Sequence, residues 1–223
     1  GSGSPVVSTD KDITLGIFWM TRGMKGARGE GKYFSSPNAA ILAYDFGDLD
    51  IHASIQINPS DNTAKYGAVS GGARFETTVG RLLFNALFPK DYPYINDEVK
   101  KSTLSKIVED LIRTYGIDAL PPILDKIKAT GFRFATKSGI TFSAADIVVP
   151  KEKDGIIDAA QKEVLHIVHE YENGLLTAEE KRRLVIEVWL RAKTEVEKHV
   201  LPSLDKNSSI YMMIVPGARG CIE

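Results

Sequence analysis

The sequence has 223 residues, of which 43% are hydrophobic and 26% charged, which is the composition of a globular protein. Its 28 basic and 29 acidic residues leave a formal net charge of -1, so net charge indicates neither a nucleic-acid nor a membrane partner. One cysteine, Cys221, excludes an internal disulfide, and no apolar run approaches the roughly 20 residues that span a bilayer. We therefore expect a cytoplasmic protein without a membrane partner.

The first third of the chain is predicted to be rich in β-structure. Residues 1–4, Gly-Ser-Gly-Ser, are typical of a linker left by cloning. Asp12–Met20 predicts a strand or a short buried segment, and Ala39–Ala43 allows a short helix. Asp50–Ile57 alternates apolar and polar side chains as a half-buried strand does, and Ala64–Val69 predicts its partner strand.

Helices are predicted in the middle of the chain. An apolar run, Leu82–Phe88, ends at Pro89. Lys100–Tyr115 places its apolar residues on one helical face and stops at Gly116. A second helix is expected over Pro121–Ala129, closed by Thr130 and Gly131, and Phe132–Phe142 is predicted to be irregular.

Residues 150–202 predict two long helices joined by a short turn. Asn173 and Gly174 indicate the end of the first helix, and Thr177 with Glu180 forms a capping-box pattern for the second. Apolar residues recur at steps of three and four, the spacing of a coiled-coil seam. The expected seam comprises Ile157, Ala160, Val164, Ile167 and Tyr171 on the first helix, and Val185, Val188, Ala192 and Val196 on the second.

The end of the sequence predicts one more buried strand, Ser209–Val215, followed by a glycine-rich turn at residues 216–220. A strand and turn that lead nowhere suggest a piece of a longer protein. The predicted fold class is α+β: a mixed β-rich and helical body, then a projecting antiparallel two-helix hairpin, then a strand that returns to the body.

Two motifs have a functional and a plain interpretation. Gly26–Lys32 fits the first seven positions of a phosphate-binding loop, but Tyr33 stands where that loop needs Ser or Thr, so a plain loop is favoured over a phosphate-loop hydrolase. His166 and His169 lie three residues apart on a predicted helix, but they lack a converging third ligand, so we expect no metal there. No catalytic constellation emerges from residue types alone.

Several motifs occur in an order that resembles the largest catalytic subunit of bacterial RNA polymerase, the beta-prime chain. The resemblance runs from about Pro5 to the end of the sequence. It rests on Met20–Arg22, Gly29–Gly31, Thr77–Arg81, Thr130–Gly139, Asp146–Pro150, Ile210–Met213 and Gly217–Gly220.

The resemblance implies a place within that enzyme. Residues 5–143 would form the pore domain and residues 144–223 a truncated funnel domain, whose hairpin at 150–202 would be the rim helices of the secondary channel. Nucleoside triphosphates would pass through this channel, and Arg219 in the Gly-Ala-Arg-Gly segment would lie on their path, where a guanidinium suits phosphate oxygens. The family has Ser where this chain has Pro216, which leaves the geometry of that turn open.

Transcript-cleavage and related factors dock on the rim helices in this family. The residues expected to serve such docking are Glu172, Asn173, Glu179, Glu180, Lys181, Arg182 and Arg183. The beta, alpha and omega subunits would be further partners, and DNA, RNA and nucleotides would be contacted only in the intact enzyme. The Asn-Ala-Asp-Phe-Asp-Gly-Asp motif that binds catalytic magnesium is absent from this sequence, so the chain alone should be inactive and should need no cofactor.

Two regulatory sites of some family members are not expected here. Asp118 and Ala129 replace the lysine and tyrosine that help to bind an alarmone, and only Asp125 remains. Arg183 and Leu184 replace an Asn-Lys pair at a second site on the rim. The competing hypothesis is a free-standing interaction module, in which a globular body presents the hairpin to a protein partner.

Overall fold

The structure is a computed structural model that describes residues 9–58, 65–66 and 73–220. These residues divide into two compact units. The first unit comprises residues up to Ile140 together with Met212–Gly220, and the second comprises Thr141–Tyr211. The first unit combines helices with a small three-stranded sheet, so the α+β class is confirmed, although the sheet is smaller than the sequence predicts.

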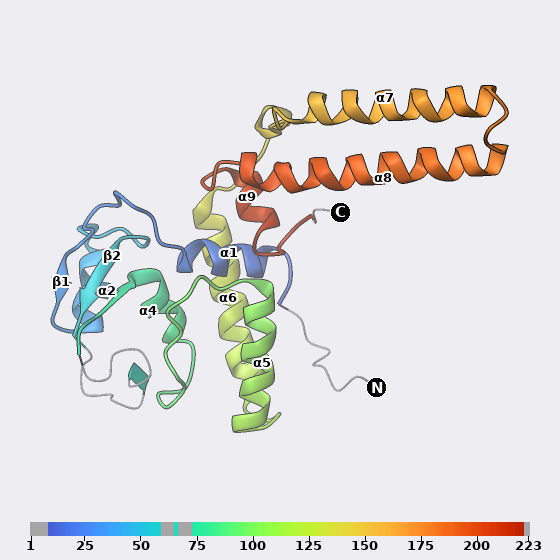
Figure 1. Cartoon of the computed structure of the whole chain (residues 1–223). Helices are drawn as coiled ribbons and strands as arrows, with labels where there is room; N and C mark the ends of the chain where they lie inside the picture. The colour runs from blue at the N-terminus through green and yellow to red at the C-terminus, as the bar shows by residue number, and fades with distance from the viewer. Residues whose placement is uncertain (1–8, 59–64, 67–72, 221–223) are drawn as a thin grey trace. The chain divides into compact units, whose positions relative to one another are not determined.

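Helix α1, Asp12–Thr21, lies at the centre of the first unit (Figure 1). Of the two alternatives predicted here, the strand was wrong and the short buried segment is confirmed. Apolar and small residues cover nearly the whole circumference of this helix, and seven of its ten residues are buried, so the sequence carries no amphipathic period. A short, uniformly apolar run fits a buried strand and a buried helix equally well.

Helix α6 extends over Leu120–Ser138, much further than the sequence predicts. Gly131 was expected to end the helix and Phe132–Phe142 to be irregular, but both expectations were wrong up to Ser138. Gly131 is buried where α1 and α6 cross: a Cβ atom placed on it would lie 2.8 Å from the Cα atom of Ile13. The glycine is thus needed for close helix packing rather than for a turn.

Glycine also permits the approach of α1 to two neighbouring helices. A Cβ atom on Gly16 would lie 1.9 Å from the carbonyl oxygen of Gly131 in α6. A Cβ atom on Gly80, in α4 (Val79–Asn85), would lie 1.6 Å from the carbonyl oxygen of Met20. Real Cβ atoms do not approach backbone so closely, so both positions require glycine in this packing.

The sheet has the order β1-β2-β3. Strand β1, Tyr33–Phe34, runs parallel to β2, Ser54–Ile57, and β3, Phe75–Thr78, runs antiparallel to it. The alternation predicted over Asp50–Ile57 is confirmed for Ser54–Ile57, where Ile55 and Ile57 are fully buried. It was wrong for residues 50–53, which precede the strand, and His52 is buried rather than solvent-facing. The partner predicted at Ala64–Val69 lies outside the described residues except for Lys65 and Tyr66, which are helical; β3 pairs with β2 instead.

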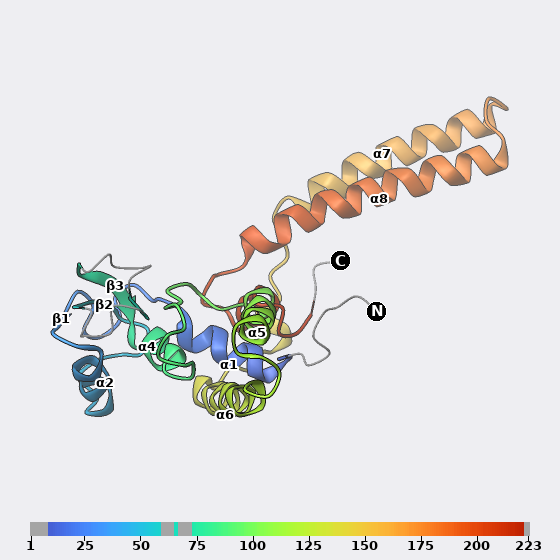
Figure 2. The ribbon, with the colours of Figure 1, turned by 90° about the horizontal axis from the view of Figure 1, so that it is seen from below.

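Two further helices cover the first unit. Helix α2, Pro37–Asp45, begins at Ser36, whose hydroxyl accepts from the Ala39 N–H, so the short helix expected there is present. Helix α5, Lys101–Tyr115, has the predicted bounds to within one residue and ends at Gly116, where φ is 79°. The main core packs α1, α4, α5 and α6 together, as the bottom view also shows (Figure 2).

His52 is a buried titratable group in this unit. Its imidazole packs edge-on against Trp19 at a centroid distance of 4.5 Å, and its Nδ1 atom donates to the carbonyl oxygen of Arg22 at 3.0 Å. Because a carbonyl only accepts, Nδ1 carries the proton, and Nε2 is a buried lone pair with no partner among the described residues. Protonation of Nε2 would therefore place a charge at a buried position where the new N–H has no acceptor among the described residues.

We expect the first unit to lose stability as the pH falls below about 6.5. Burial lowers the pKa of His52, and this outweighs its hydrogen bond to Arg22 and the nearby Asp50 carboxylate, which act in the opposite direction. The unfolded chain takes up a proton near pH 6.5 while the folded chain stays neutral. The free energy of unfolding should then fall by up to about 1.4 kcal/mol per pH unit, until the folded pKa is reached.

Denaturant titrations between pH 7.5 and 5.5, followed by Trp19 fluorescence, would measure this slope. His52 is the only histidine in the first unit, so His52→Gln should flatten it. An equal slope in both proteins would show that His52 titrates normally.

The second unit contains helices α7, Lys153–Glu172, and α8, Ala178–Ser203, which lie side by side (Figures 1 and 2). Thr177 and Glu180 form the predicted capping box, and Gly174 adopts a φ of 75° in the turn. Four of the expected seam residues, Ala160, Ile167, Val188 and Ala192, are buried between the helices. Tyr171 was also expected in the seam, but it is 37% exposed because it lies at the open end beside the turn.

Ser209–Val215 was predicted to be a buried strand, and this was wrong: Ser209–Ile214 form helix α9. The last residues of α9 belong to the first unit, where Met212 packs against Leu15 and Phe18 of α1. As in α1, the apolar run is short and has no clear period, so the sequence does not distinguish a helix from a strand here. Residues 1–4 and Cys221 lie outside the described residues.

Candidate functional site: the α7-α8 turn and the Arg219 turn

The residues expected to dock a factor surround the turn between α7 and α8. Glu172 and Asn173 end α7, and Glu179 through Arg183 form the first turns of α8. All of them are exposed except Lys181, which is partly covered. The structure therefore brings all seven predicted residues together at one end of the helix pair.

Several of these residues already make contacts within the pair. The Glu180 carboxylate accepts from the backbone N–H and the hydroxyl of Thr177, and these hydrogen bonds lower the pKa of Glu180. The Lys181 ammonium lies 4.0 Å from the ring centre of Tyr171, a cation-π contact across the turn. Arg183 lies 3.9 Å from the Glu187 carboxylate. Glu180 thus serves the helix start, whereas the basic side chains remain at the surface.

An exposed apolar stripe on α8 was missed by the sequence interpretation. Ile186, Trp189 and Leu190 are 47%, 37% and 56% exposed, and their spacing of three and four places them on one face. The seam residues Val185 and Val188 alternate with them, so the sequence predicted an ordinary amphipathic helix with a single apolar face. The only sequence signal was that both faces of α8 are apolar.

A groove of about 460 Å³ follows another side of the helix pair. Small residues such as Gly155, Ala159 and Ala160 line it, together with Arg191 and Glu163, whose ion pair joins the two helices. This contact links α7 to α8 at the surface.

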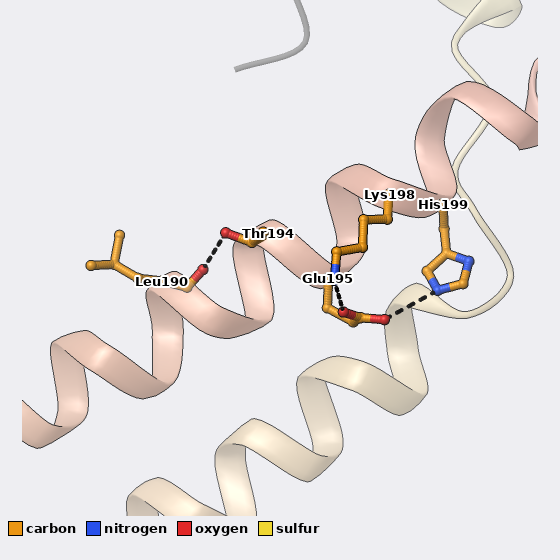
Figure 3. Close-up of polar contacts among 5 residues, drawn as sticks. All are labelled: Leu190, Thr194, Glu195, Lys198 and His199. Carbon is orange, nitrogen blue, oxygen red and sulfur yellow. Dashed lines mark hydrogen bonds and ion pairs between the residues drawn. The ribbon is translucent and has the colours of Figure 1, made fainter.

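Two histidines of the helix pair, His166 and His199, lie near carboxylates of their own helices. His166 lies 3.6 Å from Glu170 on α7. On α8, Glu195 accepts from Lys198 at 2.9 Å and faces His199 at 3.7 Å, while the Thr194 hydroxyl donates to the Leu190 carbonyl (Figure 3). Within the described ranges, no group of three or more His, Cys, Asp or Glu residues is arranged to hold a metal ion.

The glycine-rich segment Gly26–Lys32 forms a loop that leads into strand β1 rather than into a helix. The Gly26 N–H donates to the Glu30 carboxylate at 2.6 Å, so an acidic side chain stands where a phosphate-binding loop would hold its ligand. Lys32 donates to the Asp48 carbonyl at 3.4 Å. This geometry favours the plain-loop interpretation.

Arg219 lies in the turn after α9, in the first unit. Its Nε and Nη2 atoms donate to one carboxylate oxygen of Asp12, at 3.2 and 2.8 Å. Gly217 and Gly220, with φ of 72° and 75°, flank it, and its backbone N–H donates to the Met213 carbonyl. The turn holds the backbone of Arg219, while half of the side chain remains exposed.

Of the positions that bear on alarmone binding, Asp125 lies on α6 and pairs with Lys128 at 2.7 Å. Arg183 and Leu184 lie on α8. The absence of either alarmone site stays a prediction.

Among the described helices, none is long and apolar enough to cross a bilayer.

The described residues thus place the chain in the α+β class: a small α+β unit and a pair of long helices with a charged turn and an exposed apolar stripe. The chain belongs to the family described as RNA polymerase Rpb1, domain 3, whose model matches residues 1–147.

Relatives extend the similarity beyond that domain. The chain is 42% identical over 221 residues to the DNA-directed RNA polymerase subunit beta' of Desulforudis audaxviator, a match that covers 99% of this chain and 18% of the relative. The subunits of Pelotomaculum thermopropionicum and Sulfurihydrogenibium are 38% and 36% identical, with 18% and 14% of their lengths covered. The chain thus spans less than a fifth of the length of these curated relatives.

Proposed function

We propose that this chain is the pore and funnel portion of a bacterial RNA polymerase beta-prime subunit, and that α7 and α8 form the rim helices of its secondary channel. The observation that carries the proposal is the match over 99% of the chain to beta' subunits, which continues through both helices and the Arg219 turn. The exposed turn and apolar stripe of the helix pair suit a docking surface.

Catalysis would belong to the intact enzyme. The magnesium-binding aspartate motif is absent from this sequence, and the described residues form no metal-ligating cluster, so magnesium would be held by residues outside this chain. This chain would instead line the route of nucleoside triphosphates, with Arg219 contacting their phosphates. The beta, alpha and omega subunits would be its partners in the assembly, and DNA and RNA would be bound only there.

The direct test is binding of a transcript-cleavage factor to this chain, measured by titration calorimetry. We expect saturable binding of one factor per chain, lost when residues 150–202 are replaced by a short linker. Binding that persists without the helix pair would contradict the rim assignment.

Reversal of charge at Lys181, Arg182 and Arg183 is expected to weaken factor binding at least about tenfold. Arg182 and Arg183 are exposed and Lys181 is partly covered by Tyr171, outside the buried seam, so glutamate at each should leave the helices folded. An inserting acidic factor would meet repulsion, and the loss should shrink as salt rises, because exposed charges are screened. Titrations at two salt concentrations would measure both effects.

A matched control reverses three exposed basic residues in the first unit: Lys106→Glu, Arg113→Glu and Lys126→Glu. The change in net charge is identical, so affinity should fall less than about twofold if the turn residues act locally. Equal losses in both proteins would mean that net charge alone governs binding.

A further inference from the structure

Asp10 and Asp12 flank Lys11, which is the only non-glycine residue with a positive φ among the described residues. Lys11 has φ 55° and ψ -120°, outside the regions that L-residues ordinarily adopt. On one side of it Asp10 pairs with Lys101 at 2.7 Å, and on the other side Asp12 pairs with Arg219. Such strain persists where the surrounding structure imposes it, and it concentrates at functional positions.

The segment before α1 is held in this conformation by further contacts. The Thr14 hydroxyl, fully buried, donates to the Thr9 carbonyl. The Lys101 N–H donates to the Pro216 carbonyl at 2.9 Å, which ties the start of α5 to the turn that carries Arg219. The strained turn at Lys11 therefore directs Asp12 toward a segment 207 residues away in the sequence.

The Arg219 backbone is fixed independently of Asp12. Ala218 is buried against α1, with Leu15 and Phe18 in the same cluster, and the Arg219 N–H is bonded to Met213. The long side chain still has several freely rotating bonds, and among the described residues the contact that orients its guanidinium is the one with Asp12. That contact uses two of the five N–H donors of the guanidinium, so the others remain for a second anion.

We propose that Asp12 is a positioning residue that holds the Arg219 guanidinium in the orientation in which its remaining donors meet the phosphates of a nucleoside triphosphate. This inference rests on the proposed role of Arg219 on the triphosphate path. Asp12 does not touch the nucleotide. It keeps the arginine extended from the turn, so that the side chain need not be ordered when the anion arrives.

The test uses intact polymerase reconstituted with the full-length subunit, in which KM for nucleoside triphosphates and kcat are measured separately. Asp12→Asn should raise KM about threefold to fivefold with kcat retained, the size expected for a half-exposed ion pair. Asp12→Glu should restore part of the loss. In an Arg219→Ala background, Asp12→Asn should add nothing, because the group that it positions is gone.

Asp10→Asn is the matched control, because it removes the neighbouring carboxylate of the same strained turn and breaks the pair with Lys101 instead. It should leave KM within about twofold of the unmodified enzyme if the effect comes from Arg219 and not from the turn. If Asp10→Asn changes KM as much as Asp12→Asn does, the effect comes from the turn, and Asp12 has only a structural role.

Two other outcomes overturn the inference and are distinguishable. If Arg219→Ala raises KM and Asp12→Asn leaves it unchanged or lowers it, the role of Arg219 stands, and Asp12 is either irrelevant or a competitor of the phosphate. If Arg219→Ala itself leaves KM unchanged, the proposed role of Arg219 fails, and the positioning role falls with it.

Discussion

Alanine at Gly16 is expected to lower the free energy of unfolding of the first unit by about 3 kcal/mol or more. The added methyl group would lie 1.9 Å from the Gly131 carbonyl oxygen and 2.6 Å from the Ala135 backbone nitrogen. Both atoms belong to the backbone of α6, so no side-chain rotation relieves the clash, and α1 and α6 must separate. Denaturant titration followed by Trp19 fluorescence, with Trp189→Phe to silence the second unit, would measure the loss.

Gly155→Ala provides the matched control. Gly155 lies in the first turn of α7, and a Cβ atom there meets nothing within 4 Å. The same substitution should therefore stabilise the second unit, by about 0.5 to 1 kcal/mol, because alanine loses less backbone entropy in a helix than glycine does. If Gly16→Ala unfolds at the same denaturant concentration as the unmodified chain, the close crossing of α1 and α6 is wrong.

Replacement of Trp189 by alanine is expected to weaken binding of a cleavage factor about thirtyfold or more, if α8 is the rim helix that we propose. Tryptophan is among the residues that most often dominate interface energies, and a loss of about 2 kcal/mol corresponds to that factor. Ile186 and Leu190 lie beside Trp189 on the same face, so a partner helix would bury all three side chains. Titration calorimetry with the unmodified and Ala variants would measure the change.

The control for Trp189→Ala is Ile117→Ser, which changes an exposed apolar residue of the first unit that is 74% accessible. Its affinity for the factor should match that of the unmodified chain. Circular dichroism should show unchanged helix content in both variants, because Trp189 lies outside the buried seam. If Trp189→Ala binds as tightly as the unmodified chain, the docking surface is confined to the charged turn.

Amphipathic elements could be predicted from the sequence because their burial is one-sided. Helix α5 buries Leu104, Ile107, Val108 and Leu111 on one face, and its bounds differ from the prediction by one residue. The ends of α7 and α8 follow local rules: a capping hydroxyl at Thr177 and a glycine with positive φ in the turn. Neither feature depends on the rest of the chain.

Elements whose apolar residues follow no clear helical period could not be predicted in this way. Helices α1 and α9 have apolar side chains around most of their circumference, so helix and strand periods fit them about equally. Helix α6 passes through Gly131 because α1 lies against that position, and a glycine that permits close packing cannot be told locally from one that ends a helix.

Part of the candidate site could be predicted from the sequence, and part could not. The seven residues of the α7-α8 turn are neighbours in sequence, so their proximity followed from the prediction of two joined helices. The apolar stripe on α8 needed the structure, because exposure of Ile186 and Leu190 depends on which face α7 covers.

The sequence by itself determined the one-sided helices, their caps and, through ordered motifs, the resemblance to the RNA polymerase subunit. Tertiary structure decided the helical state of α1 and α9, the length of α6 and the pairing of Asp12 with Arg219. The physical reason is the range of the interactions: caps and amphipathic periods act within a few residues, whereas backbone crossings and the Asp12 contact join segments far apart in the chain. Such contacts exist only once the chain has folded.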